Sequence, residues 1–454
     1  MGLDNVIISM LKDKLKNPIV EVLKEIKIQE ILTKSNFVKR EVGIKAYFVL
    51  LHFIYMIVMN KKISTFISQS NDSFSKDVYY RLLKNKNYNW KKLLFISTNR
   101  LIFKLSHLQK NLKIKVAILD DTVESKIGKK IEGVCDKLWS NKDKKLISGI
   151  NMISLNYSDG FSNFMLDFTI KFNDKLKLSI KDFTNQFHHR SNAHKRRLEA
   201  YGSKLDIALD MIKRALLRGI DVDYLLIDSW YAKPIFINSV KDNGLDIVAR
   251  IANNVRIWNF KGKHKTLDVI YNFAKKRKIL KVGNYNKIKY KYFSFIAEHK
   301  LLGKVKIVFI KTDNNLIPII STDLILNDEE IIDIYKKRWN IEQGYKELRE
   351  YFEFGKEENR IYEALIARIT LSFLTYNIVS YINRINHEPQ TIGGLFKDLE
   401  CELTNLAISM DIFIQILDEI AKIPDIVNRN KDLIDIILLL RTHTQNELGF
   451  MCES

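Results

Sequence analysis

Between residues 335 and 349, four polar side chains are spaced so that a single helix would present them side by side. Tyr335, Arg338, Glu342 and Arg349 stand at offsets of three, seven and fourteen residues from the first. On a helix of about 3.6 residues per turn these offsets fall on one narrow stripe. Guanidinium groups bind phosphate oxygens and carboxylates bind hard cations, so the stripe is suited to phosphate chemistry. Ordinary solvated helix faces show the same spacing, and the interpretation therefore needs support from elsewhere in the chain.

Two short apolar runs that predict buried strands each end in aspartate. Asp120 and Asp121 follow the run at 116–119, and Asp228 follows the run at 224–227. Such runs are typical of strands covered on both faces, and a carboxylate at the strand end can face a cleft. An aspartate in this position is also a common helix cap or turn former. The combination of three carboxylates from separate elements is what indicates a catalytic site.

These motifs closely resemble those of the insertion-sequence DDE transposases known as the YREK class. Their signature, Y-x2-R-x3-E-x6-K, is matched by Tyr335, Arg338 and Glu342, and Arg349 stands where the family usually has lysine. The segments VAILDDT and YLLIDSWYAK, which contain the strand-end aspartates, are similar to the first and second aspartate motifs of the same family. The resemblance covers roughly residues 110–385.

The resemblance implies a carboxylate triad, which we place at Asp120, Asp228 and Glu342. Attack on a phosphodiester puts charge on the entering and the leaving oxygen, and two divalent ions roughly 3.5 to 4 Å apart stabilise both. Carboxylates suit Mg²⁺, so we expect two Mg²⁺ ions, with Mn²⁺ as a substitute. Asp120 fits the family's D-x-T pattern because it precedes Thr122 by two residues. Asp121 remains the alternative, since neighbouring residues of a strand point to opposite sides.

The rest of the signature is implied to contact DNA. Arg338 and Arg349 would hold phosphates through bidentate hydrogen bonds, and Tyr335 would donate to a phosphate near the scissile bond. Arginine in place of lysine keeps the charge but changes the geometry. Lys346, about one turn earlier, is therefore the alternative to Arg349.

Four further residues are weaker candidates for DNA contact: Trp258, Trp339, His188 and Arg190. Trp258 would stack on a flipped base, although a tryptophan in a small β-rich segment more often belongs to a core. Trp339 is expected to pack rather than to contact bases. His188 and Arg190 belong to a basic segment that fits a DNA-backbone patch and a plain solvated surface about equally well. Its spacing matches no familiar zinc motif.

Composition agrees with a globular, DNA-binding protein. The 454 residues are 46% hydrophobic, which is enough for two or three domains with a sizeable core. The net charge of +21 favours a polyanionic partner, because lysine and arginine release counterions when they neutralise phosphates. An AT-rich genome would also enrich lysine. The three cysteines are far apart, predict no disulfide framework and fit a reducing cytoplasm.

Several protein classes are not indicated. The apolar stretch at 46–59 is shorter than the roughly 20 residues that span a bilayer, and residues 1–14 do not resemble a secretory signal. Neither G-x-x-x-x-G-K-[ST] nor G-x-G-x-x-G occurs, so no nucleotide cofactor is expected. We expect no membrane association and a cytoplasmic, nucleoid-associated protein of a prokaryote.

The hydrophobic pattern predicts an α/β protein with an RNase H-like catalytic core, in which helices flank a mixed sheet. The expected parts are a helical DNA-binding or dimerisation region at 1–108, the first part of the core at 109–251, a β-rich insertion at 252–318, the second part of the core with the signature helix at 319–385, and a helical region at 386–454. Strands in the order β-β-β-α-β, with one long helix from Ser191 to about Arg218, would form the first part. The signature helix is expected to begin at Asn327, capped with Glu330, and to end at Gly355.

The function implied by the resemblance is cut-and-paste DNA transposition. The enzyme would cleave at transposon ends and transfer the exposed 3′ hydroxyl into target DNA. Its partners would be the terminal inverted repeats, the target DNA and a second copy of the chain in a synaptic complex. Two alternatives are a domesticated, catalytically inactive DNA-binding protein and an RNase H-like nuclease without strand transfer.

Overall fold

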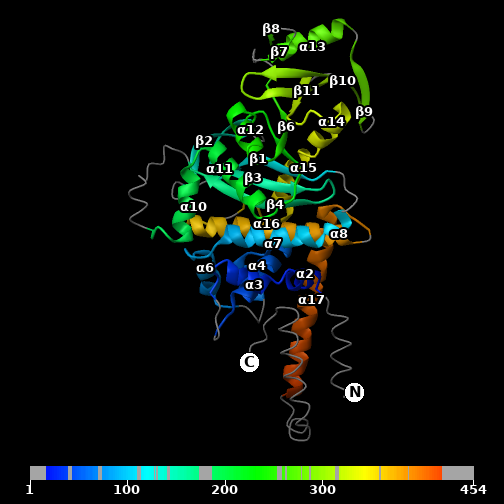
Figure 1. Ribbon diagram of the computed structural model, residues 1–454. Helices are drawn as coiled ribbons and strands as arrows, with labels where there is room; N and C mark the ends of the chain where they lie inside the picture. Colours follow the sequence, from blue (N-terminus) through cyan, green and yellow to red (C-terminus); the bar gives the residue numbers. More distant parts are fainter. Residues whose placement is uncertain are drawn as a thin grey trace.

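A computed structural model describes the fold of the chain between residues 17 and 421. The described part excludes short segments at 39–42, 70–73, 110–113, 127, 129–130, 141–143, 173–186, 253–257, 261–262, 278, 286–287, 312–315, 357–358 and 387. Figure 1 shows a central sheet with a helical layer beneath it and a smaller lobe above it.

Residues 116–250 form a mixed sheet whose main strands have the order β4-β3-β1-β5-β6. Its strands are β1 (Val116–Ser125), β3 (Lys145–Ser158), β4 (Asn163–Lys171), β5 (Tyr224–Ile227) and β6 (Asp246–Arg250). The pairs β1–β3 and β3–β4 are antiparallel, whereas β1–β5 and β5–β6 are parallel. A short strand, β2 (Cys135–Ser140), pairs with the start of β3. This mixed sheet flanked by helices confirms the predicted α/β, RNase H-like fold.

The helix predicted from Ser191 to Arg218 is two helices, α10 (Asn192–Tyr201) and α11 (Lys204–Leu217). Ser203 interrupts it, because its hydroxyl accepts from Asp206 N, 3.1 Å away, and caps the second helix. Helix α11 packs on β3 and β4. Another helix, α12 (Pro234–Lys241), connects β5 to β6.

The predicted insertion continues the same sheet. It contains β7 (Trp258–Phe260), β8 (Lys263–Lys265), α13 (Leu267–Lys276), β9 (Lys281–Tyr285), β10 (Ile288–His299) and β11 (Gly303–Lys311). Strand β12 (Leu316–Ser321) pairs with β11 on one side and with β6 on the other, antiparallel to both. The upper lobe of Figure 1 is therefore joined to the central sheet by backbone hydrogen bonds.

Helices from both ends of the chain cover the sheet together. The N-terminal ones are α2 (Pro18–Glu25), α3 (Ile28–Lys34), α4 (Ala46–Val58), α5 (Ile63–Gln69), α6 (Lys76–Leu83), α7 (Trp90–Lys104) and α8 (Ser106–Gln109). Helix α16 (Tyr362–Ile385) lies beside α7, and both pack on β4 (Figure 1). By length and composition α16 could cross a membrane, yet almost all of it is buried within the protein, as a core helix is. The long α17 (Ile392–Ala421) follows. The limits of the five predicted parts stay predictions.

The signature region is also two helices rather than one. Helix α14 (Asp328–Lys336) begins with the predicted capping box of Asn327 and Glu330. Helix α15 (Trp339–Tyr351) follows after a tight turn, in which Arg338 N bonds to Tyr335 O at 3.0 Å. The end predicted at Gly355 is wrong: the chain leaves the helix at Phe352 and turns through a left-handed Glu353, with φ of 57°.

Candidate active site

Asp120 and Asp228 lie at the same height on neighbouring parallel strands. Ile118 of β1 is paired with Leu226 of β5, and each aspartate stands two residues further on. Adjacent strands are about 4.8 Å apart, which brings the two carboxyl groups close together where β5 ends beside β1. Asp228 is held by its own turn, because its Oδ1 accepts from Trp230 N at 2.9 Å and from Tyr231 N at 3.2 Å.

The environment of Asp120 penalises its charged form. Burial raises the pKa of the Asp120 carboxyl to about 7; the charge of Arg338 opposes this rise and the negative charge of Asp228 adds to it. The two carboxyl groups therefore repel each other across a partly desolvated space. A bound cation would relieve that repulsion.

Asp121 faces different partners. Its Oδ2 lies 2.7 Å from Lys204 Nζ at the start of α11, and its Oδ1 accepts from the Tyr231 hydroxyl at 3.3 Å. Burial raises the pKa of Tyr231 well above its usual value, with Asp121 and Asp120 adding to the effect. Tyr231 therefore stays protonated and donates. Asp121 is paired within the protein, away from the contact that Asp120 makes with Arg338.

Arg338 links Asp120 to Glu342. Its Nη1 lies 3.3 Å from Asp120 Oδ2, and its Nη2 lies 2.6 Å from Glu342 Oε1. The turn between α14 and α15 places this guanidinium between Asp120 of β1 and the helical Glu342. Tyr335 is buried beside it, and burial raises the pKa of its hydroxyl although the charge of Arg338 lowers it. Tyr335, Arg338 and Glu342 thus lie together, although across two helices rather than on the single helix that was predicted.

Tyr345 fixes α15 against the sheet on the same side. Its hydroxyl lies 2.7 Å from Ser154 Oγ on β3, and Ser154 is the residue paired with Asp120. Burial raises the pKa of Tyr345 well above its usual value, and the charge of Asp120 raises it further. The aromatic side of α15 therefore supports the first carboxylate, while its polar side carries Glu342.

The chain matches two family models over the part that holds these residues. Residues 74–265 match the DDE superfamily endonuclease, and residues 199–378 match the transposase DDE domain. This chain carries DDE-superfamily transposase domains. Together the two matches cover all three carboxylates, and they imply nuclease or transposase activity on DNA. No curated protein matches the chain.

DDE transposase domains generally depend on divalent metal ions, and the donor set here fits them. Among the described residues, no group of three His, Cys, Asp or Glu side chains is arranged closely enough to hold a metal ion as it stands. The Arg338 guanidinium lies between Asp120 and Glu342 and contacts both. A positive group thus already bridges two of the three carboxylates.

Arg349 lies apart from this cluster. It donates to Glu124 Oε1 at 2.6 Å and to Thr122 Oγ1 at 2.5 Å, and so attaches α15 of the transposase domain to β1. Lys346 is exposed and forms no ion pair with any described residue. Arg349 is therefore engaged with β1, whereas the side chain of Lys346 is exposed to solvent.

The four weaker candidates lie in different places. Trp339 is 63% exposed, so the expectation that it packs is wrong; the turn before α15 directs it outward. Trp258 pairs with Lys265 across the β7–β8 hairpin of the insertion. His188 and Arg190 are exposed just before α10, and Arg190 N donates to His188 Nδ1.

Sequence reasoning missed three residues of the site: Lys204, Tyr231 and Tyr345. Tyr231 stands in the segment around Asp228, and its place one turn after a strand end was a usable signal. Lys204 comes 83 residues after Asp121, and no spacing rule connects them. Trp230 is also 44% exposed next to Asp228, with Lys204 Nζ 4.9 Å from its ring centroid.

Proposed function

We propose that this protein is a transposase of the YREK class of insertion sequences, which cleaves DNA at transposon ends and joins the exposed 3′ hydroxyl to target DNA. The observation that carries the proposal is the convergence of Asp120 and Asp228 on neighbouring strands with Glu342, which Arg338 connects to Asp120. The pattern Tyr335, Arg338, Glu342 supports the subclass.

In this proposal Asp120, Asp228 and Glu342 hold two Mg²⁺ ions, which Mn²⁺ can replace. Bound there, the ions would stabilise charge on the attacking and leaving oxygens of the phosphodiester. Asp120 is favoured over Asp121, because Lys204 and Tyr231 already neutralise and orient Asp121. Asp121 then attaches the middle of β1 to the start of α11 through Lys204.

The protein's own groups would bind and orient the DNA. Arg338 lies beside the carboxylates and presents a planar set of donors that suits a phosphate. Tyr335 keeps its proton, since burial raises its pKa, and can donate to the same phosphate. Lys346 is the better phosphate ligand at the far end of α15, because Arg349 is engaged with β1.

Two exposed indoles flank the carboxylates and suit unpaired bases. Trp339 follows Arg338 directly, and Trp230 follows Asp228 by two residues. Stacking of a base on an aromatic ring stabilises it by about 1 to 3 kcal/mol. Bases unpaired at a cleaved end would therefore be held next to the reacting phosphate. The partners are transposon-end DNA, target DNA and a second protomer that brings the other end, in the cytoplasm at the nucleoid.

The test is a cleavage and joining assay with the inverted repeats that flank the gene, in Mg²⁺ and in Mn²⁺, comparing the native protein with Glu342→Ala. Joined product from the native protein alone is expected. Nicked DNA without joined product would indicate that the protein is a nuclease rather than a transposase. DNA binding without any cleavage would indicate a domesticated, catalytically inactive DNA-binding protein.

A further inference from the structure

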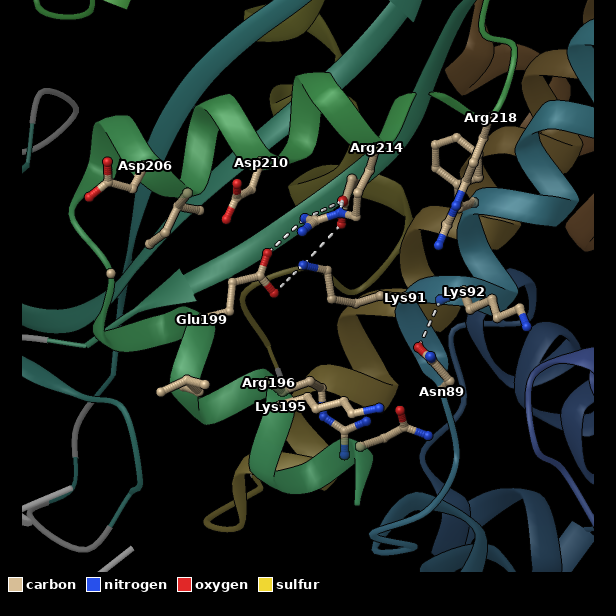
Figure 2. A pocket seen from close by; sticks show the side chains of 16 residues that line it. Asn89, Lys91, Lys92, Lys195, Arg196, Glu199, Asp206, Asp210, Arg214 and Arg218 are labelled. Carbon is tan, nitrogen blue, oxygen red and sulfur yellow. Dashed lines mark hydrogen bonds and ion pairs between the residues drawn. The ribbon is translucent and has the colours of Figure 1, made fainter. Parts of the chain in front are cut away.

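A second charged cleft lies between α7, α10 and α11, away from the carboxylates. It has a volume of about 460 Å³ and contains Lys91, Lys92, Lys195, Arg196, Arg214 and Arg218 together with four acidic residues. Figure 2 shows Lys91, Glu199 and Arg214 projecting toward one another from the three helices, with the other side chains around them. The cleft and the carboxylate site share α11, because Lys204 of this helix reaches Asp121 whereas Asp206 and Asp210 line the cleft.

The inner part of the cleft is neutralised within the protein. Lys91 lies 3.2 Å from Asp167 and 2.7 Å from Glu199, and Arg214 lies 2.7 Å from each of the same two carboxylates. Two positive and two negative groups form this network. The groups outside it determine what else the cleft can bind.

The outer part is basic at one end and acidic at the other. Lys92 and Lys195 form no ion pair with any described residue. In Figure 2 they lie with Arg196 near Asn89, whereas Asp206 and Asp210 lie at the opposite end of the cleft. An anion would therefore be bound at the start of α7 and α10, where the helix dipoles also favour negative charge.

Arg196 supplies an independent sign of a missing ligand. Its side chain is 5% exposed and lines the cleft, yet its Nε and Nη2 have no hydrogen-bond partner among the described residues. Nη1 donates to Tyr88 O at 2.7 Å, and the nearest carboxylate, that of Glu363, is 3.9 Å from Nη2. Buried guanidinium donors are normally satisfied, and two parallel donors match a phosphate well.

We propose that this cleft binds a phosphate of the DNA backbone at Lys92, Lys195 and Arg196, so that the duplex is held on both sides of α11. The inference rests on the proposed function, which supplies DNA as the ligand. A backbone phosphate is favoured over a small free anion because the basic surface continues outside the cleft. Lys86 and Arg190 are exposed there, and Lys86 O accepts from Ala193 N of α10, which joins the two segments.

The test measures affinity for a short duplex of random sequence over a series of salt concentrations. For Lys92→Glu with Lys195→Glu we expect weaker binding and a salt slope reduced by roughly 1 to 2, since each lost phosphate contact removes about 0.9. Lys45→Glu is the control for a charge reversal, because Lys45 is exposed and lines a separate cavity. It should leave the slope unchanged.

Arg196→Gln tests the buried member, with its unfolding temperature measured alongside. Weaker DNA binding at an unchanged unfolding temperature supports the assignment, and unchanged binding removes Arg196 from it. An unaltered salt slope in the variant with Lys92→Glu and Lys195→Glu would contradict phosphate binding in the cleft, but it would not affect the proposed transposase function. If inorganic phosphate stabilises the native protein but not the double variant, and the DNA slope is unaltered, the cleft is a small-anion site instead. Absence of DNA binding by the native protein would overturn both proposals.

Discussion

Lys204 Nζ lies 2.7 Å from Asp121 Oδ2, and this ion pair distinguishes two consecutive aspartates that the sequence leaves equivalent. Asp120, one residue earlier, contacts Arg338 instead. The side chains of neighbouring strand residues point to opposite sides, and here each side has its own cationic partner. Only Asp120 shares its partner with Glu342.

The two aspartates should therefore respond differently to removal of their charge. Asp120→Asn is expected to slow DNA cleavage by about 1,000-fold or more, because metal stabilisation of the reacting oxygens is worth several kcal/mol. Asp121→Asn should cost about 10- to 100-fold, as loss of a group that orients a ligand does. Single-turnover cleavage rates with matched DNA-binding affinities measure both. Equal losses would contradict the separation of roles.

Substitution of Arg349 should mainly affect stability, whereas substitution of Lys346 should mainly affect DNA binding. Arg349→Ala removes the hydrogen bonds to Glu124 and Thr122, and we expect it to lower the free energy of unfolding by about 1.5 to 3 kcal/mol. Lys346→Ala should leave stability within about 0.5 kcal/mol and weaken binding to end DNA.

Denaturant unfolding and DNA titration of both variants measure the two effects. Arg349→Lys is the matched control, since it introduces the lysine of the YREK signature but keeps only one bonding group. If Lys346→Ala binds DNA normally and Arg349→Ala does not, Arg349 is the phosphate ligand despite its contacts with β1.

The end of the Asp228 strand and part of the signature stripe could be predicted, because both depend on local pattern. The strand end expected before Asp120 is wrong, since β1 continues to Ser125, and Arg349 lies apart from the stripe. Asp120 and Asp228 follow short apolar runs, and parallel pairing then brings them together. The turn at Arg338 could not be predicted, since no glycine or proline marks it. Contacts distant in sequence accompany it, such as that of Lys337 Nζ with Ile114 O at 3.0 Å.

The residues of the site that the sequence did not reveal also depend on contacts between distant parts of the chain. Lys204 reaches Asp121 only because Ser203 caps a new helix at that point. Arg349 bonds to β1 only because α15 crosses that strand. The indole of Trp339, which was expected to pack, is exposed at the start of α15, directly after the turn at Arg338.

Gly344 should control how closely α15 approaches the sheet. A Cβ atom at this position would lie 2.5 Å from Asn163 Nδ2 and 2.9 Å from Met165 Cε, both on β4. Asn163 Nδ2 is itself bonded to Asn340 O at 3.0 Å. We expect Gly344→Ala to destabilise the protein by about 1 to 3 kcal/mol, although alanine favours a helix by about 1 kcal/mol.

The same substitution should reduce cleavage, because it displaces Glu342 relative to Asp120. Gly394→Ala is the control, since its contacts are with the side chains of Gln390 and Thr391 at 3.2 Å. Thermal unfolding and cleavage rates measure both variants. Full stability of Gly344→Ala would mean that Asn163 moves aside without cost.

Asp167 should make the stability of the protein depend on pH in the acidic range. Burial alone would raise the pKa of its carboxyl, but the charges of Arg214 and Lys91 outweigh this and hold the pKa below its usual value. The lowered pKa contributes its full stabilisation at pH values above the unfolded-state pKa of about 3.9, and this stabilisation is lost as the pH falls through the folded-state pKa.

Asp167→Asn should therefore cost about 3 kcal/mol of stability at neutral pH, as loss of one partner of a buried ion pair does. The difference in stability from the native protein should shrink below about pH 4. Urea unfolding of both proteins across this range measures the difference, and Asp206→Asn, on the exposed end of the same cleft, is the control. A difference that does not change with pH would show that Asp167 stabilises the fold through its shape and hydrogen bonds rather than through its charge.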